Sequence, residues 1–310
     1  MRKMKKYLSI ILSIVLMLVV VSACNGNKGD ADSTIVIFDG EFSESKIIHQ
    51  MVKMLVEDHT DATVDIRDEM SPVNSYRNLA SGDCDIMNSY DGTLLTTYLK
   101  KDVPDVPADQ TLYEYANEVA MEQDGTRLLK KMGHENTYAV GVTDQLAEDY
   151  DLDTISDLVP FASELVFGAE HEFFSEEGSM KYNPFVDFYN LEFEESKAIE
   201  MSLKYSAVEN GNIDVTIVYS TDGMNKKVGL KVLEDDKDFF AEYNCALLVR
   251  DDLFERFEEI APDLEQVLNM LSGQFTNEIM TDLTYEVDVN GATPEEVARD
   301  YLLEHDLIEE

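Results

Sequence analysis

Two stretches of the chain each carry a tyrosine at the end of a short apolar run. The first reads G-D-C-D-I-M-N-S-Y-D-G at 82–92, and the second reads G-N-I-D-V-T-I-V-Y-S-T-D-G at 211–223. In both, an aspartate follows the glycine by three residues, and a tyrosine, Tyr90 or Tyr219, follows it by eight. A repeated strand that ends in an exposed ring indicates two similar lobes, each directing a tyrosine at one cleft. The alternative is a chance match between two ordinary helix–turn–strand units.

A second pair of tyrosines, Tyr138 and Tyr243, shows the same kind of internal similarity. Each precedes an apolar run that is followed by an aspartate. The two segments look like crossings between lobes near residues 139 and 245, which would enclose a second lobe. The predicted division is 34–138 plus 245–310 for lobe 1 and 139–244 for lobe 2.

Strands and helices alternate from residue 34 onward, as judged from the spacing of the apolar residues. Such alternation predicts an α/β fold with a mostly parallel sheet joined by crossovers. The predicted strands of the first lobe are at 34–38, 63–66 and 85–89, and its predicted helices are at 45–58, 73–81 and 111–131. Three further helices would return the chain to lobe 1, at 253–260, 262–272 and 294–303.

The N-terminus has the pattern of an exported lipoprotein. Four basic residues precede an apolar run at 8–21 that is too short to span a membrane comfortably. Small residues then lead into Cys24, a pattern at which bacterial lipoproteins are cleaved and acylated. We expect 1–23 to be a lipoprotein signal peptide, Cys24 to carry the lipid, and 24–33 to be a polar tether on the outer face of the cell membrane. An uncleaved signal anchor is the alternative.

The composition is that of an acidic globular protein. Hydrophobic residues make up 44% of the 310 residues, a length sufficient for two lobes of ordinary size. The formal net charge of −40 makes nucleic acid and anionic lipid surfaces poor partners. Either the charge draws a cationic ligand, or the acids serve solubility. Because most of the acids lie on predicted solvated helix faces, solubility accounts for the larger share.

No pattern in the sequence is typical of catalysis or metal binding. The chain lacks G-x-S-x-G and H-E-x-x-H, and no carboxylates are paired at a telling spacing. Cys84 and Cys245 lie in apolar runs, which predicts buried free thiols rather than a disulfide or a metal site. We therefore expect no enzyme activity, no metal and no cofactor. The histidines show no ligand spacing: His49, His59, His134, His171 and His305.

Seven motifs occur in a recognisable order from about residue 34 to the end of the chain. They are S-Y-D-G-T at 89–93, N-T-Y-A at 136–139, I-S-D-L at 155–158, L-V-F-G-A at 165–169, Y-S-T-D-G at 219–223, V-L-E-D-D-K-x-F-F at 232–240 and V-D-V-x-G-x-x-P-E-E-V-A at 287–298. In this combination the chain resembles the substrate-binding lipoproteins of osmoprotectant ABC transporters. That family takes up glycine betaine, choline, carnitine and related quaternary amines.

The resemblance implies a two-lobed, type II-like periplasmic-binding-protein fold with a hinge and a central ligand cleft. It also implies a quaternary ammonium ligand and, as partners, the permease and ATPase of an ABC importer. In this family four tyrosines form a cage around the trimethylammonium group, and the matching residues are Tyr90, Tyr138, Tyr219 and Tyr243. A quaternary ammonium group cannot donate hydrogen bonds, so it binds aromatic faces by cation–π attraction.

Thr93 bears on the polar end of such a ligand. Its family counterpart faces the ligand beside the cage. Because a threonine hydroxyl can donate to a carboxylate, Thr93 favours carboxylated betaines or a broad spectrum of ligands.

The chain departs from the family in three places. Asp91 adds a carboxylate next to the cage, residues 43–45 read S-E-S instead of T-E-Q, and residues 71–74 read S-P-V-N instead of G-G-T-N. These departures leave the preferred amine open.

Three functions follow from these observations. The first is a transport receptor for a quaternary amine, which the motifs favour. The second is an enzyme at the cell surface, for which the sequence offers no catalytic pattern. The third is a surface lipoprotein that binds another organic cation or acts as a sensor.

Overall fold

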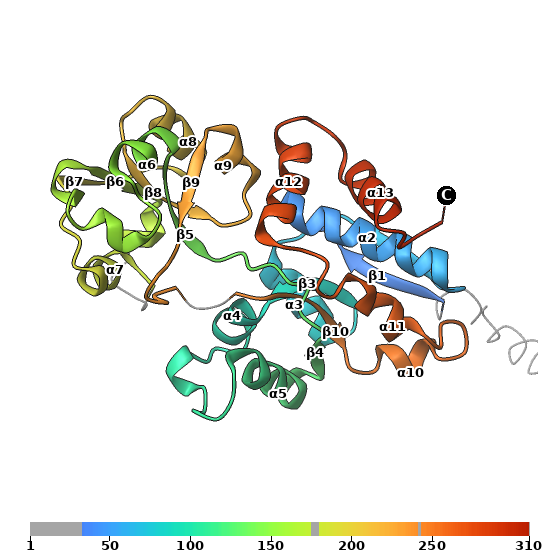
Figure 1. The fold of residues 1–310 in the computed structure, drawn as a ribbon. Helices are drawn as coiled ribbons and strands as arrows, with labels where there is room; N and C mark the ends of the chain where they lie inside the picture. The colour runs from blue at the N-terminus through green and yellow to red at the C-terminus, as the bar shows by residue number, and fades with distance from the viewer. Residues whose placement is uncertain (1–32, 175–179, 241–242, 310) are drawn as a thin grey trace, which may run out of the picture.

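The computed structural model describes residues 33–174, 180–240 and 243–309 (Figure 1). The predicted signal peptide and Cys24 lie outside the described residues, as does all of the predicted tether except its last residue, Ser33. Within the described ranges, no helix is long and apolar enough to cross a membrane.

The chain folds into two lobes, and the described residues directly before β5 and β10 lie between them (Figure 1). The first lobe contains the N-terminal elements, from blue to dark green, and the C-terminal helices in darker orange to red; the second contains the elements between them, from light green to light orange. The first-lobe elements are β1 (Thr34–Phe38), α2 (Ser43–His59), β2 (Thr63–Arg67), α3 (Pro72–Ser81), β3 (Ile86–Tyr90), α4 (Asp91–Thr93), η1 (Leu94–Tyr98), η2 (Val103–Asp105), α5 (Leu112–Asp124), β4 (Thr126–Leu128), β10 (Cys245–Arg250), α10 (Leu253–Phe257), α11 (Leu264–Leu268), η6 (Asn269–Leu271), α12 (Asn277–Asp288) and α13 (Pro294–Glu304).

Helix α2 forms the centre of the first lobe because its apolar residues recur at helical spacing. Ile47, Ile48, Met51 and Leu55 are fully buried, as the sequence predicted for this face. They pack in one core with β1, β10 and the C-terminal helices. The helix begins beside the inter-lobe cleft, and its first turn carries Glu44.

The second lobe is built on a five-stranded sheet in the order β7-β6-β8-β5-β9. Its core is rich in phenylalanine, including the fully buried Phe167, Phe173 and Phe185. The second-lobe elements are β5 (Tyr138–Thr143), α6 (Asp144–Tyr150), η3 (Ile155–Leu158), η4 (Ala162–Glu164), β6 (Val166–Ala169), η5 (His171–Phe174), α7 (Tyr182–Tyr189), β7 (Glu195–Ala198), α8 (Met201–Glu209), β8 (Val215–Tyr219), α9 (Gly223–Lys227) and β9 (Leu230–Leu233).

Parallel and antiparallel strand pairs both occur among the described strands, so the prediction of a mostly parallel sheet was wrong. Strands β1 and β2 pair in parallel, and β6 pairs in parallel with β7 and β8. Strand β10 is antiparallel to β3 and β4, and β5 is antiparallel to β8 and β9. The reason is that β5 and β10 enter their lobes from the crossings. Each starts at the cleft, where the neighbouring β8 or β3 ends.

Two further predictions need correction. The helix expected at 111–131 ends at Asp124, because Gly125 adopts φ 61° as its C-cap and the chain then forms β4. Tyr138, which the predicted division assigned to lobe 1, is the first residue of β5 in the second-lobe sheet. Tyr243, which the predicted division assigned to lobe 2, packs with its ring on Gly92 of the first lobe. The other residue boundaries of the lobes stay a prediction.

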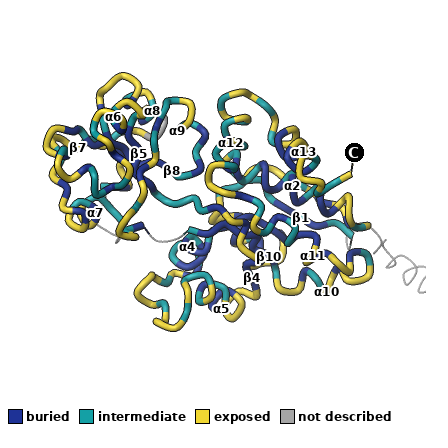
Figure 2. Tube along the Cα trace, viewed as in Figure 1, coloured by how far each residue is buried: buried dark blue, intermediate teal, exposed yellow. Residues whose placement is uncertain are grey.

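Helix α12, which the sequence analysis did not predict, packs against both α2 and α9. Gly223 at the start of α9 lies so close to α12 that an added Cβ would sit 2.5 Å from the backbone nitrogen of Tyr285. The hydroxyl of Thr284 donates to the carbonyl of Thr221 at 2.8 Å. Strands β3, β5, β8 and β10 are almost entirely buried, whereas the edge strand β7 is largely exposed (Figure 2).

Candidate functional site

A cavity of about 530 Å³ lies between the two lobes. Its walls carry residues from both lobes, including all five residues predicted to contact a ligand. These are Tyr90, Thr93, Tyr138, Tyr219 and Tyr243. The structure therefore brings the predicted ligand-binding residues together on one surface, while their role in binding stays a prediction.

Tyr138 and Tyr219 form the second-lobe side of the cavity. They are cross-strand partners in the β5–β8 ladder, and their rings stack with centroids 5.5 Å apart at 27°. Behind them, Phe173 and Phe240 contact Tyr138 edge-on at 5.7 and 6.3 Å. This aromatic backing fixes the orientation of the two rings.

Tyr90 and Tyr243 form the first-lobe side of the cavity. Tyr90 ends β3, opposite the start of β10. The ring of Tyr243 lies on the backbone of Gly92, where an added Cβ would come within 2.5 Å of the ring. A glycine is therefore required at position 92 to seat this tyrosine.

The carboxylate of Glu44 is a hydrogen-bond centre at the base of the cavity. It lines the cavity but is only 4% exposed. Four groups donate to it, from both lobes and from the crossing before β5: the hydroxyl of Tyr90, Nε2 of His134 at 3.1 Å, Nδ2 of Asn136 at 3.3 Å and the hydroxyl of Thr221 at 2.7 Å. The sequence analysis did not single out Glu44 as a site residue. A glutamate is common in the first turn of a helix, and no sequence pattern around Glu44 predicts a binding role.

Electrostatics keep Glu44 charged and the cage tyrosines neutral. Burial alone would raise the pKa of Glu44, but the charge and hydrogen bond of His134, with the bonds from Tyr90 and Thr221, lower it overall. Burial, followed by the charge of Glu44, raises the pKa of Tyr90 well above its ordinary value. Burial is also the main cause of the raised pKa of Tyr138, Tyr219 and Tyr243. The cavity thus presents neutral phenol rings and, next to Tyr90, a buried carboxylate that is paired with His134.

Asp91 does not line the cavity, although the sequence placed its carboxylate next to the cage. It is 1% exposed and accepts from the backbone nitrogens of Gly92 at 2.8 Å and Asn244 at 2.9 Å. Its other oxygen accepts from Nδ2 of Asn244 at 2.9 Å. Burial raises its pKa to about 6, although these hydrogen bonds oppose the shift. Asp91 therefore ties the second crossing to the first lobe.

Two lysines lie over the second-lobe rings without lining the cavity. Nζ of Lys181 is 5.8 Å from the centroid of Tyr138, and Nζ of Lys204 is 5.7 Å from that of Tyr219. Lys204 is almost fully buried and forms a 2.7 Å ion pair with Glu170. The pair neutralises this lysine, so its charge does not oppose a cation at the ring of Tyr219.

Two lobes with a cavity of ligand size between them define the class of this molecule: a two-lobed substrate-binding protein. The chain belongs to the family described as the substrate-binding domain of ABC-type glycine betaine transport systems, whose sequence model matches residues 33–304. This family consists of transport proteins that bind substrate and not of enzymes. The resemblance inferred from the motifs is confirmed.

Known relatives and solved structures agree with this assignment. The carnitine transport binding protein OpuCC of Listeria monocytogenes is 30% identical over 312 residues, which cover 99% of each chain. A glycine-betaine-binding protein of Pseudomonas aeruginosa is 29% identical, over 74% of this chain and 75% of that protein. A crystal structure described as a glycine betaine/carnitine/choline ABC transporter matches with a TM-score of 0.80 and 28% identity, covering 89% of this chain and 99% of that chain.

Proposed function

We propose that this protein binds a quaternary ammonium compound of the glycine betaine, carnitine or choline class and delivers it to an ABC importer. The observation that carries the proposal is the convergence of four tyrosines from both lobes on one cavity that also contains the buried carboxylate of Glu44. A permanent cation without hydrogen-bond donors fits this combination of aromatic faces and negative charge.

The energetics are sufficient for transport. Each ring contributes about 0.5–2 kcal/mol to the binding of a desolvated cation. Four rings, with the attraction of the Glu44 carboxylate, support a dissociation constant of roughly micromolar order after ordering costs.

The polar end of the ligand is assigned to the first-lobe side of the cavity. Thr93 follows Tyr90 by three residues, lines the cavity and offers a hydroxyl donor to a ligand carboxylate. The cavity also has apolar walls formed by Met70, Met87 and Met180. The hydroxyl of Thr93 favours carboxylated betaines. The cavity volume of about 530 Å³ leaves room for a ligand longer than glycine betaine.

Anchoring and delivery complete the proposal. Cys24 would carry the lipid that holds the protein on the outer face of the membrane, beside the permease and ATPase complex. The V-S-A-C pattern at 21–24 supports this assignment.

Calorimetric titration with glycine betaine, carnitine, choline and proline betaine tests the proposed function. The control is 3,3-dimethylbutan-1-ol, in which carbon replaces the charged nitrogen of choline. We expect at least one of the quaternary amines to bind at roughly micromolar concentration, and the neutral analogue to bind at least tenfold more weakly than choline. Equal affinity for choline and its neutral analogue would exclude a cation site, and no binding of any amine would overturn the proposal.

A further inference from the structure

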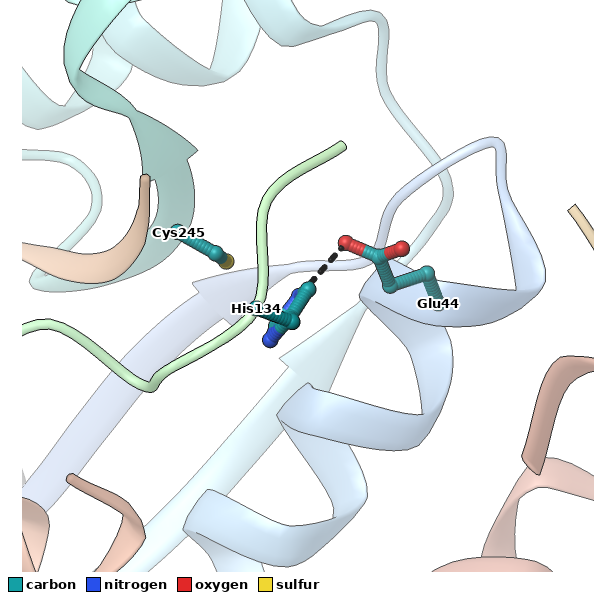
Figure 3. A group of neighbouring side chains, drawn as sticks. All are labelled: Glu44, His134 and Cys245. Carbon is teal, nitrogen blue, oxygen red and sulfur yellow. Dashed lines mark hydrogen bonds and ion pairs between the residues drawn. The ribbon is translucent and has the colours of Figure 1, made fainter. Parts of the chain in front are cut away.

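Three buried side chains from distant parts of the chain meet in one cluster (Figure 3), and one of them, Glu44, lines the cavity. Glu44 comes from the first turn of α2, His134 from the crossing before β5, and Cys245 from the start of β10. One oxygen, nitrogen and sulfur atom from these residues all lie within 4.8 Å of one another. The three residues are 4%, 1% and 0% exposed, respectively.

We propose that Glu44, His134 and Cys245 bind a divalent, thiol-binding transition-metal ion of the Zn²⁺ class. Zn²⁺ binds thiolate sulfur at about 2.3 Å and imidazole nitrogen or carboxylate oxygen at about 2.0–2.2 Å, so its ligand atoms lie roughly 3.5 Å apart. The nitrogen and oxygen are already 3.1 Å apart, and the sulfur lies within 4.8 Å of both. Small side-chain movements therefore complete three ligand positions.

The charges of the three ligands suit a buried dication. On binding, the ion would displace the thiol proton of Cys245, which is released to solvent. The resulting thiolate and the Glu44 carboxylate would then balance the two positive charges next to a neutral imidazole. The formal net charge of −40 also raises the local concentration of cations around the protein.

The imidazole of His134 has bonding capacity that the described contacts do not use. Nε2 pairs with Glu44, whereas Nδ1 is buried and has no hydrogen-bond partner among the described residues. A buried polar atom without a partner is uncommon in folded proteins. Because no described residue is hydrogen-bonded to Nδ1, the ring proton can sit on Nδ1, and Nε2 can then bind the ion through its lone pair.

Glu44 connects the cluster both to the cavity and to the tyrosine cage. Because Glu44 lines the cavity, an ion can reach the cluster from the cleft. The hydroxyl of Tyr90 donates to the same carboxylate, so a residue of the proposed cage directly contacts one of the proposed metal ligands. Metal and organic cation would therefore influence each other's affinity, and this influence is reciprocal. The metal site itself does not depend on which amine the cavity binds.

Titration of the chelator-treated protein with Co²⁺ tests the proposal. We expect a near-ultraviolet sulfur-to-cobalt charge-transfer band that saturates at one ion per chain and disappears when Zn²⁺ is added. Cys245→Ser should abolish the band, and His134→Gln should weaken cobalt binding at least tenfold. Cys84→Ser is the matched control, because Cys84 is also a buried free cysteine but lies outside the cluster. This control should keep the band.

A second measurement uses only the wild-type protein, in case Cys245→Ser does not fold. Zn²⁺, but not Mg²⁺, should slow alkylation of Cys245 at least tenfold, and more than it slows alkylation of Cys84, as read by peptide mass mapping. No charge-transfer band at saturating Co²⁺, or a band of unchanged intensity in folded Cys245→Ser, would show that the three residues form only a buried hydrogen-bonded cluster. Equal protection of both cysteines would overturn the proposal in the same way.

Discussion

Tyr138 and Tyr219 lie directly opposite each other on antiparallel strands, and their rings stack 5.5 Å apart. Both strands reach the cleft at this pair, because β5 begins where β8 ends. The backbone pairing thus sets two of the four cage rings relative to each other before any ligand is present. The other two rings come from the opposite lobe, so the complete cage requires both lobes.

Removing a cage ring should weaken cation binding. Tyr→Ala at Tyr90, Tyr138, Tyr219 or Tyr243 should each raise the dissociation constant for choline about five- to thirtyfold, which corresponds to about 1–2 kcal/mol. Tyr→Phe should cost much less at Tyr138, Tyr219 and Tyr243, because the ring face remains. Calorimetry on each purified variant measures the effect.

The matched control for the cage variants is Tyr115→Ala. Tyr115 packs at the edge of a first-lobe core and does not line the cavity. Thermal melts must accompany each variant, since a destabilised lobe would imitate a lost contact. If the four alanine variants fold and bind like the wild type, the cage is not formed by these tyrosines.

Glu44→Gln should reduce both affinity and stability. The change removes the buried negative charge, so the dissociation constant for choline should rise roughly tenfold, or about 1.4 kcal/mol. Loss of charged hydrogen bonds to His134 and Thr221 should lower the free energy of unfolding by roughly 1.5–3 kcal/mol in denaturant titrations. Glu41→Gln is the control, because Glu41 also lines the cavity but is exposed. Equal effects of the two changes would contradict a special role for Glu44.

Asp91 should make stability depend on pH. Its folded pKa of about 6 exceeds the ordinary value of 3.8, so between these values the folded protein retains a proton that the unfolded chain has lost. Its contribution to the free energy of unfolding is therefore complete below about pH 4 and falls by up to roughly 3 kcal/mol as the pH rises through 6.

Asp91→Asn removes this titration, and the amide of Asn244 can turn to accept from the new side chain. Relative to the wild type, the free energy of unfolding of this variant should rise between pH 4 and pH 7 in urea titrations. The exposed Asp109→Asn serves as the control and should show no such trend. A constant difference between Asp91→Asn and the wild type across this range would contradict the prediction.

The two lobes should close on the ligand about the two crossings. The cavity lies between lobes that are connected near β5 and β10, which allows a hinge motion. Small-angle scattering should show a smaller radius of gyration with saturating glycine betaine or choline than without it. An unchanged radius with a ligand that calorimetry shows to be bound would count against closure.

Cys24→Ser should prevent lipid attachment. The variant precursor should stay uncleaved or be released from the membrane fraction, because the thiol that accepts the lipid is absent. Metabolic labelling with a fatty acid and cell fractionation measure this, with Cys84→Ser as the control that should remain labelled. A labelled, normally fractionating Cys24→Ser protein would disprove the assignment of Cys24.

The sequence alone determined the features that depend on near neighbours in the chain. The apolar stripe of α2 follows from helical spacing, and Tyr90 and Tyr219 fall at strand ends because each follows a short apolar run after a turn. The order of the motifs was enough to indicate the family. The apolar spacing alone predicted a helix that continued to residue 131, whereas the glycine at position 125 ends α5 at Asp124.

Only the tertiary structure decided which distant groups meet. Strand direction in β5 and β10 depends on how the crossings enter each lobe, which local pattern does not encode. Asp91 turned away from the cavity because Asn244, far along the chain, offers it hydrogen bonds. The same is true of the cluster formed by Glu44, His134 and Cys245. Packing of the whole chain brings these distant residues together, and their spacing in the sequence does not predict the contact.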